Sequence, residues 1–152
     1  MIHIKSNLMM EKRIIMYKIG YTQGAFDMFH IGHLNLLKHA KEKCEYLIVG
    51  VNTDELIADY KAKHAVIPLA ERMSILEAIR YVDKVVPADT LDKTDIVKQL
   101  KCDAIFIGDD WANDPRWIRT KKDMKKIGVD VIFLPYTQDT NSTLLREKLK
   151  NY

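Results

Sequence analysis

The chain lacks long apolar runs: nowhere in its 152 residues is there a stretch of about 18 apolar residues, the length that a membrane-spanning helix needs. It holds only two cysteines, Cys44 and Cys102, which stand alone and far apart. Neither a disulfide scaffold nor a Cys-x-x-Cys zinc site is therefore indicated. Internal repeats and low-complexity linkers are also missing. These absences favour a globular protein of a reducing compartment, which we expect to be the cytoplasm.

The chain also lacks a large excess of positive or negative charge. Lys and Arg number 24 against 21 Asp and Glu, a formal net charge of +3, and no basic run has aromatic residues interleaved with it. Nucleic-acid binding is therefore disfavoured, whereas small phosphorylated molecules remain compatible as ligands. We expect a single domain over residues 17–152, since a chain of this length buries one substantial core. Residues 1–16 are expected to be a dispensable leader. They do not look like a signal peptide, because they lack a continuous apolar core and a small-residue cleavage site.

Strand-like and helix-like patterns alternate along the rest of the chain. Short apolar runs predict strands, and apolar residues at helical spacing predict helices. The expected strands are 17–22, 46–51, 82–87, 104–107 and 129–134, and the expected helices are 31–44, 68–79, 90–100, 117–127 and one that begins near residue 142. Residues 52–66 are predicted to form a mobile loop. This order predicts an α/β, Rossmann-like open five-stranded parallel sheet with helices on both faces, which binds ligands beyond the carboxyl ends of its strands.

The stretch from Gly24 to His33 links the first expected strand to the first expected helix. At such a junction, free backbone N–H groups and the positive end of the helix dipole converge on a spot where an anion can bind. Gly24 allows close approach of a phosphate, and Gly32 leaves the first helical turn open to ligand or backbone. His30 and His33, three residues apart, project from one face and can donate hydrogen bonds to an anion.

Other interpretations of this stretch remain open. A histidine is commonly a structural residue, and two histidines at this spacing also suit zinc, although no further ligands cluster with them in the sequence. Asp27 either assists the reaction or fixes the turn by accepting backbone N–H groups, and the second role is favoured.

The motif His30-Ile31-Gly32-His33 matches the His-x-Gly-His signature of a nucleotidyltransferase superfamily, and residues 24–30 resemble the first signature of its cytidylyltransferases. Within that family the chain is most similar to the bacterial glycerol-3-phosphate enzymes, from about residue 18 to residue 149. The resemblance implies transfer of CMP from CTP to a small phosphorylated alcohol with release of pyrophosphate. It also implies a homodimer and a Mg²⁺ ion held mainly by the nucleotide phosphates, with few protein ligands.

The same resemblance assigns roles to individual residues. It implies His30, His33 and Lys61 as catalytic residues, although Lys61 and Lys63 on composition alone are ordinary solvated charges. Expected to bind nucleotide are Gly24, Ala25, Phe26, Gly32, Arg72, Asp109, Asp110, Trp111, Tyr136, Thr137, Ser142 and Thr143. Expected to bind the acceptor are Asp27, Asp54, Lys63 and Arg80. Arg72 and Arg80 lie off the apolar stripe of the 68–79 helix.

The chain departs from the family pattern at Tyr136, where relatives carry an arginine that binds phosphate. We expect Arg116, Arg119 or Arg146 to replace it, with Arg119 and Arg146 preferred because Arg116 follows Pro115 in an expected turn. Two alternative functions remain: an adenylyltransferase acting on a sugar phosphate, and a nucleotide-binding module without turnover. Retention of both histidines and the loop lysines argues against the module.

Overall fold

The computed structural model describes residues 16–138 and 140–152, so residues 1–15 of the expected leader lie outside the described part of the chain. Five parallel strands form one sheet in the order β3-β2-β1-β4-β5. They are β1 (Tyr17–Gly24), β2 (Cys44–Asn52), β3 (Lys84–Ala88), β4 (Ala104–Gly108) and β5 (Asp130–Leu134). The predicted α/β architecture is confirmed. The order reverses between β1 and β4, so a crevice opens there at the carboxyl ends of the strands.

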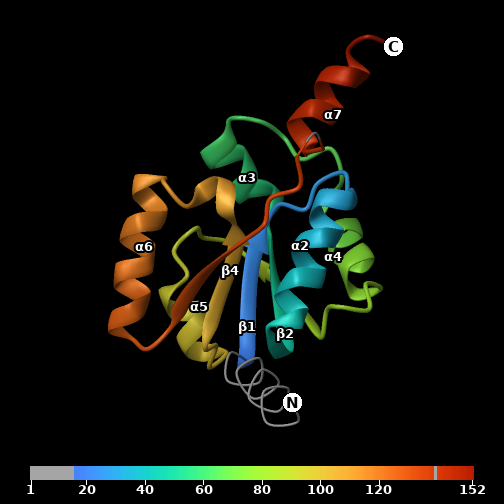
Figure 1. The fold of residues 1–152 in the computed structure, drawn as a ribbon. Coiled ribbons are helices and arrows are strands. Elements are labelled where there is room, and N and C mark those ends of the chain that lie inside the picture. Colours follow the sequence, from blue (N-terminus) through green and yellow to red (C-terminus); the bar gives the residue numbers. More distant parts are fainter. Residues whose placement is uncertain (1–15, 139) are drawn as a thin grey trace, which may run out of the picture.

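Helices cover both faces of this sheet (Figure 1). On one face α2 (Ile31–Glu42) and α4 (Leu69–Glu77) bury apolar residues against the sheet, among them Leu37 and Leu76, which are fully buried. On the other face α5 (Thr94–Gln99) and α6 (Pro115–Lys126) contribute Val97, Trp117 and Met124 to a second core. Successive residues along a strand point to opposite faces, so β2 and β4 supply both cores.

The expected mobile loop at 52–66 begins instead with a helix, α3 (Asp54–Lys61). The Thr53 hydroxyl caps it by accepting a hydrogen bond from the backbone N–H of Leu56 at 3.1 Å. Ile57, 2% exposed, anchors the helix to the core. The helix ends at Ala62, whose φ of 51° is left-handed. Lys61 therefore lies in the last turn of a helix.

Strands β4 and β5, which lie on the other side of the switch point from β1, are each followed by a further element. A single 3-10 turn, η1 (Asp109–Trp111), follows β4, and α7 (Ser142–Leu149) follows β5 after a connecting segment. The side chain of Asn141 caps α7. Figure 1 shows α7 leading away from the body of the molecule beyond the carboxyl ends of the strands.

Both thiols, Cys44 and Cys102, are buried and unpaired. Among the helices that the structure describes, none is long and apolar enough to cross a membrane.

Candidate active site

The turn between β1 and α2 is held by the carboxylate of Asp27, which is 3% exposed. Its Oδ1 atom accepts hydrogen bonds from the backbone N–H groups of Met28 at 3.1 Å and Ile67 at 2.9 Å, and its Oδ2 atom accepts one from Val66 at 2.8 Å. Burial raises the pKa of Asp27, but the hydrogen bonds from Val66 and Ile67 and the charge of Arg146 together bring it below its usual value. Of the two roles considered for Asp27, fixing the turn is the one that these contacts show.

The left-handed positions of this turn fall on residues other than glycine. Phe26 and Met28 have φ angles of 50° and 49°, a conformation that costs free energy for residues with a Cβ. The ring of Phe26 is buried and packs edge-on against His33, with ring centroids 5.3 Å apart. The strained turn therefore fixes the position of the first histidine-bearing turn of α2.

His30 and His33 form a reciprocal cap at the start of α2. The Nδ1 atom of His30 accepts from the backbone N–H of Gly32 at 3.1 Å, and the Nδ1 atom of His33 accepts from the backbone N–H of His30 at 3.3 Å. An accepting Nδ1 carries no proton, so each neutral ring carries its proton on Nε2. The rings stack with centroids 3.7 Å apart.

Both imidazoles are neutral near pH 7. Burial, followed by the neighbouring charges of His30 and Lys61, lowers the pKa of His33 to about 3, and burial also lowers the pKa of His30. The Nε2 atom of His30 is buried without a hydrogen-bond partner among the described residues. Buried donors are normally paired, so this unpaired Nε2–H is available to a ligand. The pair acts as neutral donors.

Because Gly32 has no side chain, the ring of His30 can pack directly against it. A Cβ on Gly32 would lie 2.9 Å from Cε1 of His30 and 3.2 Å from the backbone oxygen of Thr140. Real Cβ atoms do not approach that closely, so a side chain here would displace the imidazole. The space around Gly24 is less tight, since the atom nearest to a Cβ added there would be Cε2 of Phe26, at 3.3 Å.

The side chain of Arg72 was expected to lie off the apolar stripe of its helix, but it is buried, with 1% of its surface exposed. Its guanidinium donates to the backbone oxygens of Ile67, Ala25 and Asn52 at 2.7–2.8 Å and to the carboxylate of Asp54 at 2.6 Å. These four bonds join the β1 turn, the end of β2 and the segment before α4. Arg72 and Asp54 thus support the backbone of the site, and neither lines the cavity.

Arg80 lies at the opposite end of the sheet from the turn, because it precedes the first residue of β3. It is exposed, and its guanidinium donates to the hydroxyl of Tyr81 at 3.0 Å. Lys63 is exposed just beyond α3 and, like Arg80, does not line the cavity. The structure therefore leaves Lys63 and Arg80 apart from the other candidates for acceptor binding.

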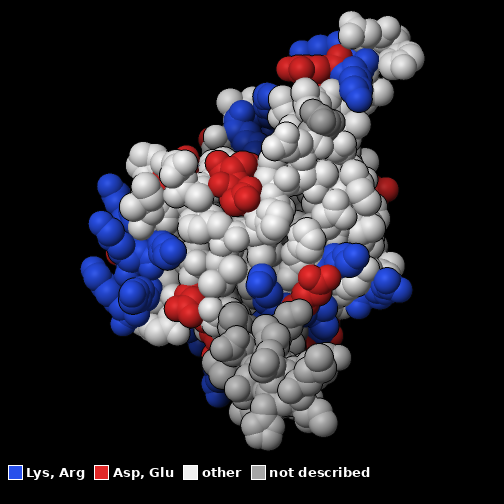
Figure 2. Space-filling view, viewed as in Figure 1, with Lys and Arg blue, Asp and Glu red and all other residues white. Residues whose placement is uncertain are grey.

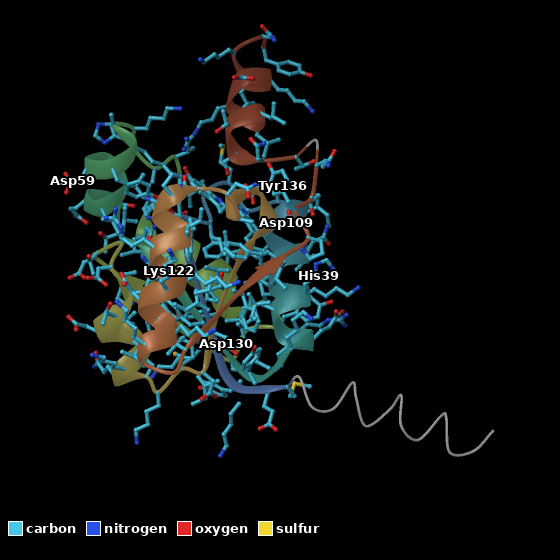
Figure 3. All side chains as sticks on the ribbon, turned by 60° about the vertical axis from the view of Figure 1, so that its left-hand side comes forward. His39, Asp59, Asp109, Lys122, Asp130 and Tyr136 are labelled. Carbon is cyan, nitrogen blue, oxygen red and sulfur yellow. The ribbon has the colours of Figure 1, made fainter. Side chains whose placement is uncertain are left out.

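The ends of β4 and β5 meet as expected. Figure 3 shows Asp109 and Tyr136 together at the carboxyl end of the sheet, with Asp130 at the other end of β5. The backbone N–H of Tyr136 donates to Oδ1 of Asp109 at 3.1 Å, and the Thr137 hydroxyl accepts from Asn35 at 3.0 Å. Burial raises the pKa of Asp110.

A cavity of about 250 Å³ opens at the switch point. Of the residues expected from the sequence to be catalytic, nucleotide-binding or acceptor-binding, those that line it are Gly24, Ala25, Phe26, Asp27, His33, Lys61, Trp111 and Ser142. Sequence reasoning missed Gln23, Asn52, Tyr60, Leu91, Lys93 and Trp117, which also line it. The signal for Gln23 and Asn52 was available, because both stand at or next to the carboxyl ends of their strands, the edge at which ligands were expected to bind.

Two of the three arginines considered as replacements at Tyr136 reach the cavity, Arg116 and Arg146, whereas Arg119 does not line it. The preference for Arg119 over Arg116 was therefore misplaced: Pro115 starts α6 rather than occupying a separate turn, and Arg116 follows it in the first turn. Arg146 pairs with Asp27, its Nη2 atom 2.6 Å from Oδ2, and the Ser142 hydroxyl donates to the Asp27 backbone oxygen at 2.8 Å.

Charge in this cavity is unbalanced. Its described lining contains the cations Lys61, Lys93, Arg116 and Arg146 but the single carboxylate Asp27. Arg146 and backbone N–H groups already occupy that carboxylate. Partial burial and the charge of Arg146 lower the pKa of Lys61. The cavity is therefore suited to a polyanion, and the outer surface beside it, over α6, is also rich in Lys and Arg (Figure 2).

A divalent ion finds few protein ligands here. The described residues contain no group of three or more His, Cys, Asp or Glu side chains placed to hold a metal. Asp27 is the one carboxylate in the described lining of the cavity, and its oxygens are already bonded to the protein. This donor set suits an ion that arrives with its own phosphate and water ligands.

Comparisons with known proteins agree with this geometry. A family model described as cytidylyltransferase-like matches residues 21–148. Glycerol-3-phosphate cytidylyltransferase of Bacillus subtilis (strain 168) is 37% identical over 130 residues, covering 84% of this chain and 94% of that protein. FAD synthase of Pyrococcus abyssi is 40% identical over 114 residues, covering 74% of this chain and 77% of that protein.

One solved structure shows the same fold. The lipopolysaccharide core biosynthesis protein from Thermoplasma volcanium superposes with a TM-score of 0.67 at 22% sequence identity, covering 82% of this chain and 99% of that chain. At that identity the likeness concerns the fold alone.

Proposed function

The chain belongs to the cytidylyltransferase-like family, and from that premise we propose that it transfers CMP from CTP to a small phosphorylated alcohol, such as glycerol 3-phosphate, and releases pyrophosphate. The product would be a CDP-activated precursor for a cell-surface polymer or a phospholipid. The observation that carries the proposal is the cation-rich cavity at the switch point, which His33 lines and beside which His30 is stacked.

The reaction is a displacement at phosphorus. An oxygen of the acceptor phosphate attacks the α-phosphorus of CTP, a new P–O bond forms, and the bond to the β-phosphate oxygen breaks with its electron pair leaving on pyrophosphate. The acceptor phosphate is largely ionised near pH 7, so no strong protein base is required. The enzyme's contribution is positioning and stabilisation of charge.

The residues of the cavity supply that stabilisation. Neutral Nε2–H donors on His30 and His33, together with the free N–H groups at the start of α2, are directed to the triphosphate. Lys61 and Arg146 add positive charge, and Arg146 exchanges Asp27 for phosphate when the nucleotide binds. Ser142 also lines the cavity, where its hydroxyl donates to the backbone oxygen of Asp27. Trp111 offers a ring face to the nucleoside.

We also propose that Mg²⁺ enters with the nucleotide and neutralises triphosphate charge. This proposal rests on the family resemblance. The protein is further proposed to work in the cytoplasm as a homodimer, on the family resemblance. Arg72 offers no contact surface for such a dimer, because its side chain is buried within its own chain. Light scattering that shows only monomer would exclude the dimer.

The test is a pyrophosphate-release screen of four nucleoside triphosphates against phosphorylated acceptors. The proposal predicts release with CTP and a small phosphorylated alcohol, and little with ATP. The second candidate, adenylyl transfer, is favoured by the match to FAD synthase, because FAD contains an adenylate half. Preference for ATP across the panel would establish it and overturn the first proposal.

A further inference from the structure

A chain of side-chain hydrogen bonds leads from the second core of the molecule to the cavity. The hydroxyl oxygen of Tyr21 is 2.7 Å from Oε1 of Gln23, and Nε2 of Gln23 is 3.0 Å from Oδ1 of Asn52. The Nδ2 atom of Asn52 is in turn 3.0 Å from the hydroxyl oxygen of Tyr60. The first three of these side chains are at most 8% exposed, whereas Tyr60 is partly buried near the end of α3. The chain of bonds therefore ends at Tyr60, which lines the cavity.

A backbone carbonyl fixes the direction of these bonds. Nε2 of Gln23 is also 2.9 Å from the backbone oxygen of Thr90, which can only accept a hydrogen bond. Both protons of the Gln23 amide are thus donated, one to Thr90 and one to Oδ1 of Asn52. Because Oδ1 of Asn52 accepts, the atom of Asn52 that faces Tyr60 is its amide nitrogen, which can only donate. The hydroxyl oxygen of Tyr60 is therefore an acceptor in this bond.

The start of the chain of bonds is fixed as well. Burial raises the pKa of Tyr21, so its hydroxyl stays protonated near pH 7 and donates to Oε1 of Gln23. Gly50 makes room for this hydroxyl, because a Cβ on residue 50 would overlap the Tyr21 oxygen. Oε1 and both protons on Nε2 of Gln23 are thus bonded within the protein. Gln23 orients its neighbours and has no free proton for a ligand.

The hydroxyl of Tyr60 is left with one free proton. Its oxygen accepts from Asn52, and no acceptor for its own proton lies among the described residues. Burial raises the pKa of Tyr60, although the bond from Asn52 and the charges of Arg116 and Arg72 act to lower it. The hydroxyl is therefore protonated near pH 7. It is a neutral donor to whatever fills the cavity beside Lys61.

The position of Tyr60 in the fold indicates which part of the substrates it meets. Tyr60 lies on the helix that follows β2, whereas Trp111, proposed above to face the nucleoside, follows β4. These two strands flank β1 on opposite sides. The histidine turn, proposed to hold the triphosphate, follows β1 and so lies between them. A charged donor bonds a phosphate more strongly than a phenol does, so the cations are the better phosphate ligands and the neutral donor suits a neutral oxygen.

We propose that the Tyr60 hydroxyl donates a hydrogen bond to a hydroxyl oxygen in the alcohol portion of the acceptor. Tyr21, Gln23 and Asn52 are positioning residues that hold Tyr60 as a donor. The inference rests on the proposed function and adds to it a preference for polyol phosphates over alkyl phosphates that lack a hydroxyl. A site built to bond a substrate hydroxyl discriminates against an analogue without one, because the donor is then left unpaired.

The first test compares glycerol 3-phosphate with propyl phosphate, which lacks both hydroxyls, as acceptors for the wild type and Tyr60→Phe. Phenylalanine keeps the ring and removes the donor. The wild type is expected to favour glycerol 3-phosphate in kcat/KM about fivefold or more, and Tyr60→Phe about twofold or less, while the KM for CTP stays within about twofold. The matched control is Tyr17→Phe, since the Tyr17 hydroxyl also donates a bond, to Asp130 at 2.8 Å, but does not line the cavity. It should keep the wild-type preference.

Three outcomes of this comparison would overturn the inference. They are an equal loss with both acceptors in Tyr60→Phe, a wild-type preference that survives in that variant, and a rise in the KM for CTP. Turnover of both acceptors by the wild type at the same kcat/KM would also overturn it, yet would leave cytidylyl transfer in place. Absence of turnover with CTP and either acceptor would overturn the proposed function and this inference together.

A double-mutant cycle tests the positioning role of Asn52. In Asn52→Asp both side-chain oxygens accept, so one takes the proton from Gln23 and the other takes the proton of Tyr60. The preference for glycerol 3-phosphate should therefore fall as it does in Tyr60→Phe. The double variant should show no further fall, because both changes remove the same bond to the acceptor. Losses of preference that add in the double variant, or a preference that Asn52→Asp leaves intact, would refute the positioning role.

Discussion

Replacing Lys93, one of the cations that line the cavity, with methionine is expected to stabilise the protein. In the folded chain Lys93 carries its charge in a buried position beside Arg116 and without a carboxylate partner. Methionine has similar length and no charge, so it fills the same space next to Trp117 without the desolvation cost. Binding sites often retain such unfavourable charges, because the ligand relieves them.

The magnitude follows from the pKa of Lys93. A fall from 10.5 to about 8 means that the charged native state is disfavoured by about 3 kcal/mol relative to the unfolded chain at pH 7. The variant also loses the contact with the Trp117 ring and the hydrogen bond to Leu91, together worth roughly 1–2 kcal/mol. The net gain is about 1–2 kcal/mol, or roughly 3–6 °C in Tm for a chain of this size.

The sign of the pH dependence is fixed as well. Because the folded pKa of Lys93 is depressed, the wild-type native state releases its proton first and gains stability relative to the unfolded chain as pH rises from about 8 to 10.5. The advantage of the variant is therefore greatest below pH 8 and shrinks above it. Urea unfolding at pH 7 and at pH 9.5 measures both effects.

The control is Lys98→Met, an exposed lysine on the same helix, for which a change within about 0.5 kcal/mol is expected. A Lys93→Met protein that is no more stable than the wild type at pH 7 would refute the reasoning, as would an advantage that does not shrink at high pH.

Further predictions concern the turn and its supports. His30→Asn keeps a good helix cap but lacks the Nε2–H donor, so turnover should fall by roughly 100-fold with little change in unfolding free energy; near-normal turnover would show that the donor is not used. Arg146→Gln should weaken CTP binding in calorimetry about tenfold or more, with Arg119→Gln unchanged; equal affinities would remove Arg146 from the nucleotide site. Arg72→Met leaves buried carbonyl oxygens without a donor, so the free energy of unfolding in urea should fall by about 3–5 kcal/mol. A fall no larger than that caused by replacing an exposed arginine would contradict the supporting role of Arg72. Since the pKa of His33 is depressed to about 3, the stability that it contributes is present above pH 6.5 and lost as pH falls toward 3; His33→Asn should therefore show a flatter stability profile between pH 7 and 4.5 than the wild type.

The sheet and its switch point were predictable because apolar periodicity records burial directly. Strand β4 was predicted within one residue, and Gly128, with φ of 77°, ends the α6 region as a left-handed cap. Helix α3 was missed although Thr53 and the acidic residues after it are an N-terminal helix signal, because the charged residues from Lys61 to His64 interrupt the apolar spacing of a helix.

The site was less predictable where a charged side chain is buried in the folded chain. Periodicity placed Arg72 off the apolar stripe of its helix, but the side chain is buried, and four hydrogen bonds in the folded chain compensate its burial. Lys93 gave no sequence signal, since its burial depends on the packing of Trp117 from another helix. Tautomers and pKa values of His30 and His33 likewise depend on the backbone bonds of the folded turn.

The central claim is cytidylyl transfer to a phosphorylated alcohol, and ³¹P NMR of the reaction mixture tests it most directly. With CTP, Mg²⁺ and glycerol 3-phosphate, the account predicts loss of the triphosphate signals and the appearance of pyrophosphate with a pair of coupled diphosphate signals from the CDP-linked product. CTP that remains intact while ATP is consumed with the same acceptor, or formation of CMP and pyrophosphate without a coupled diphosphate, would contradict it.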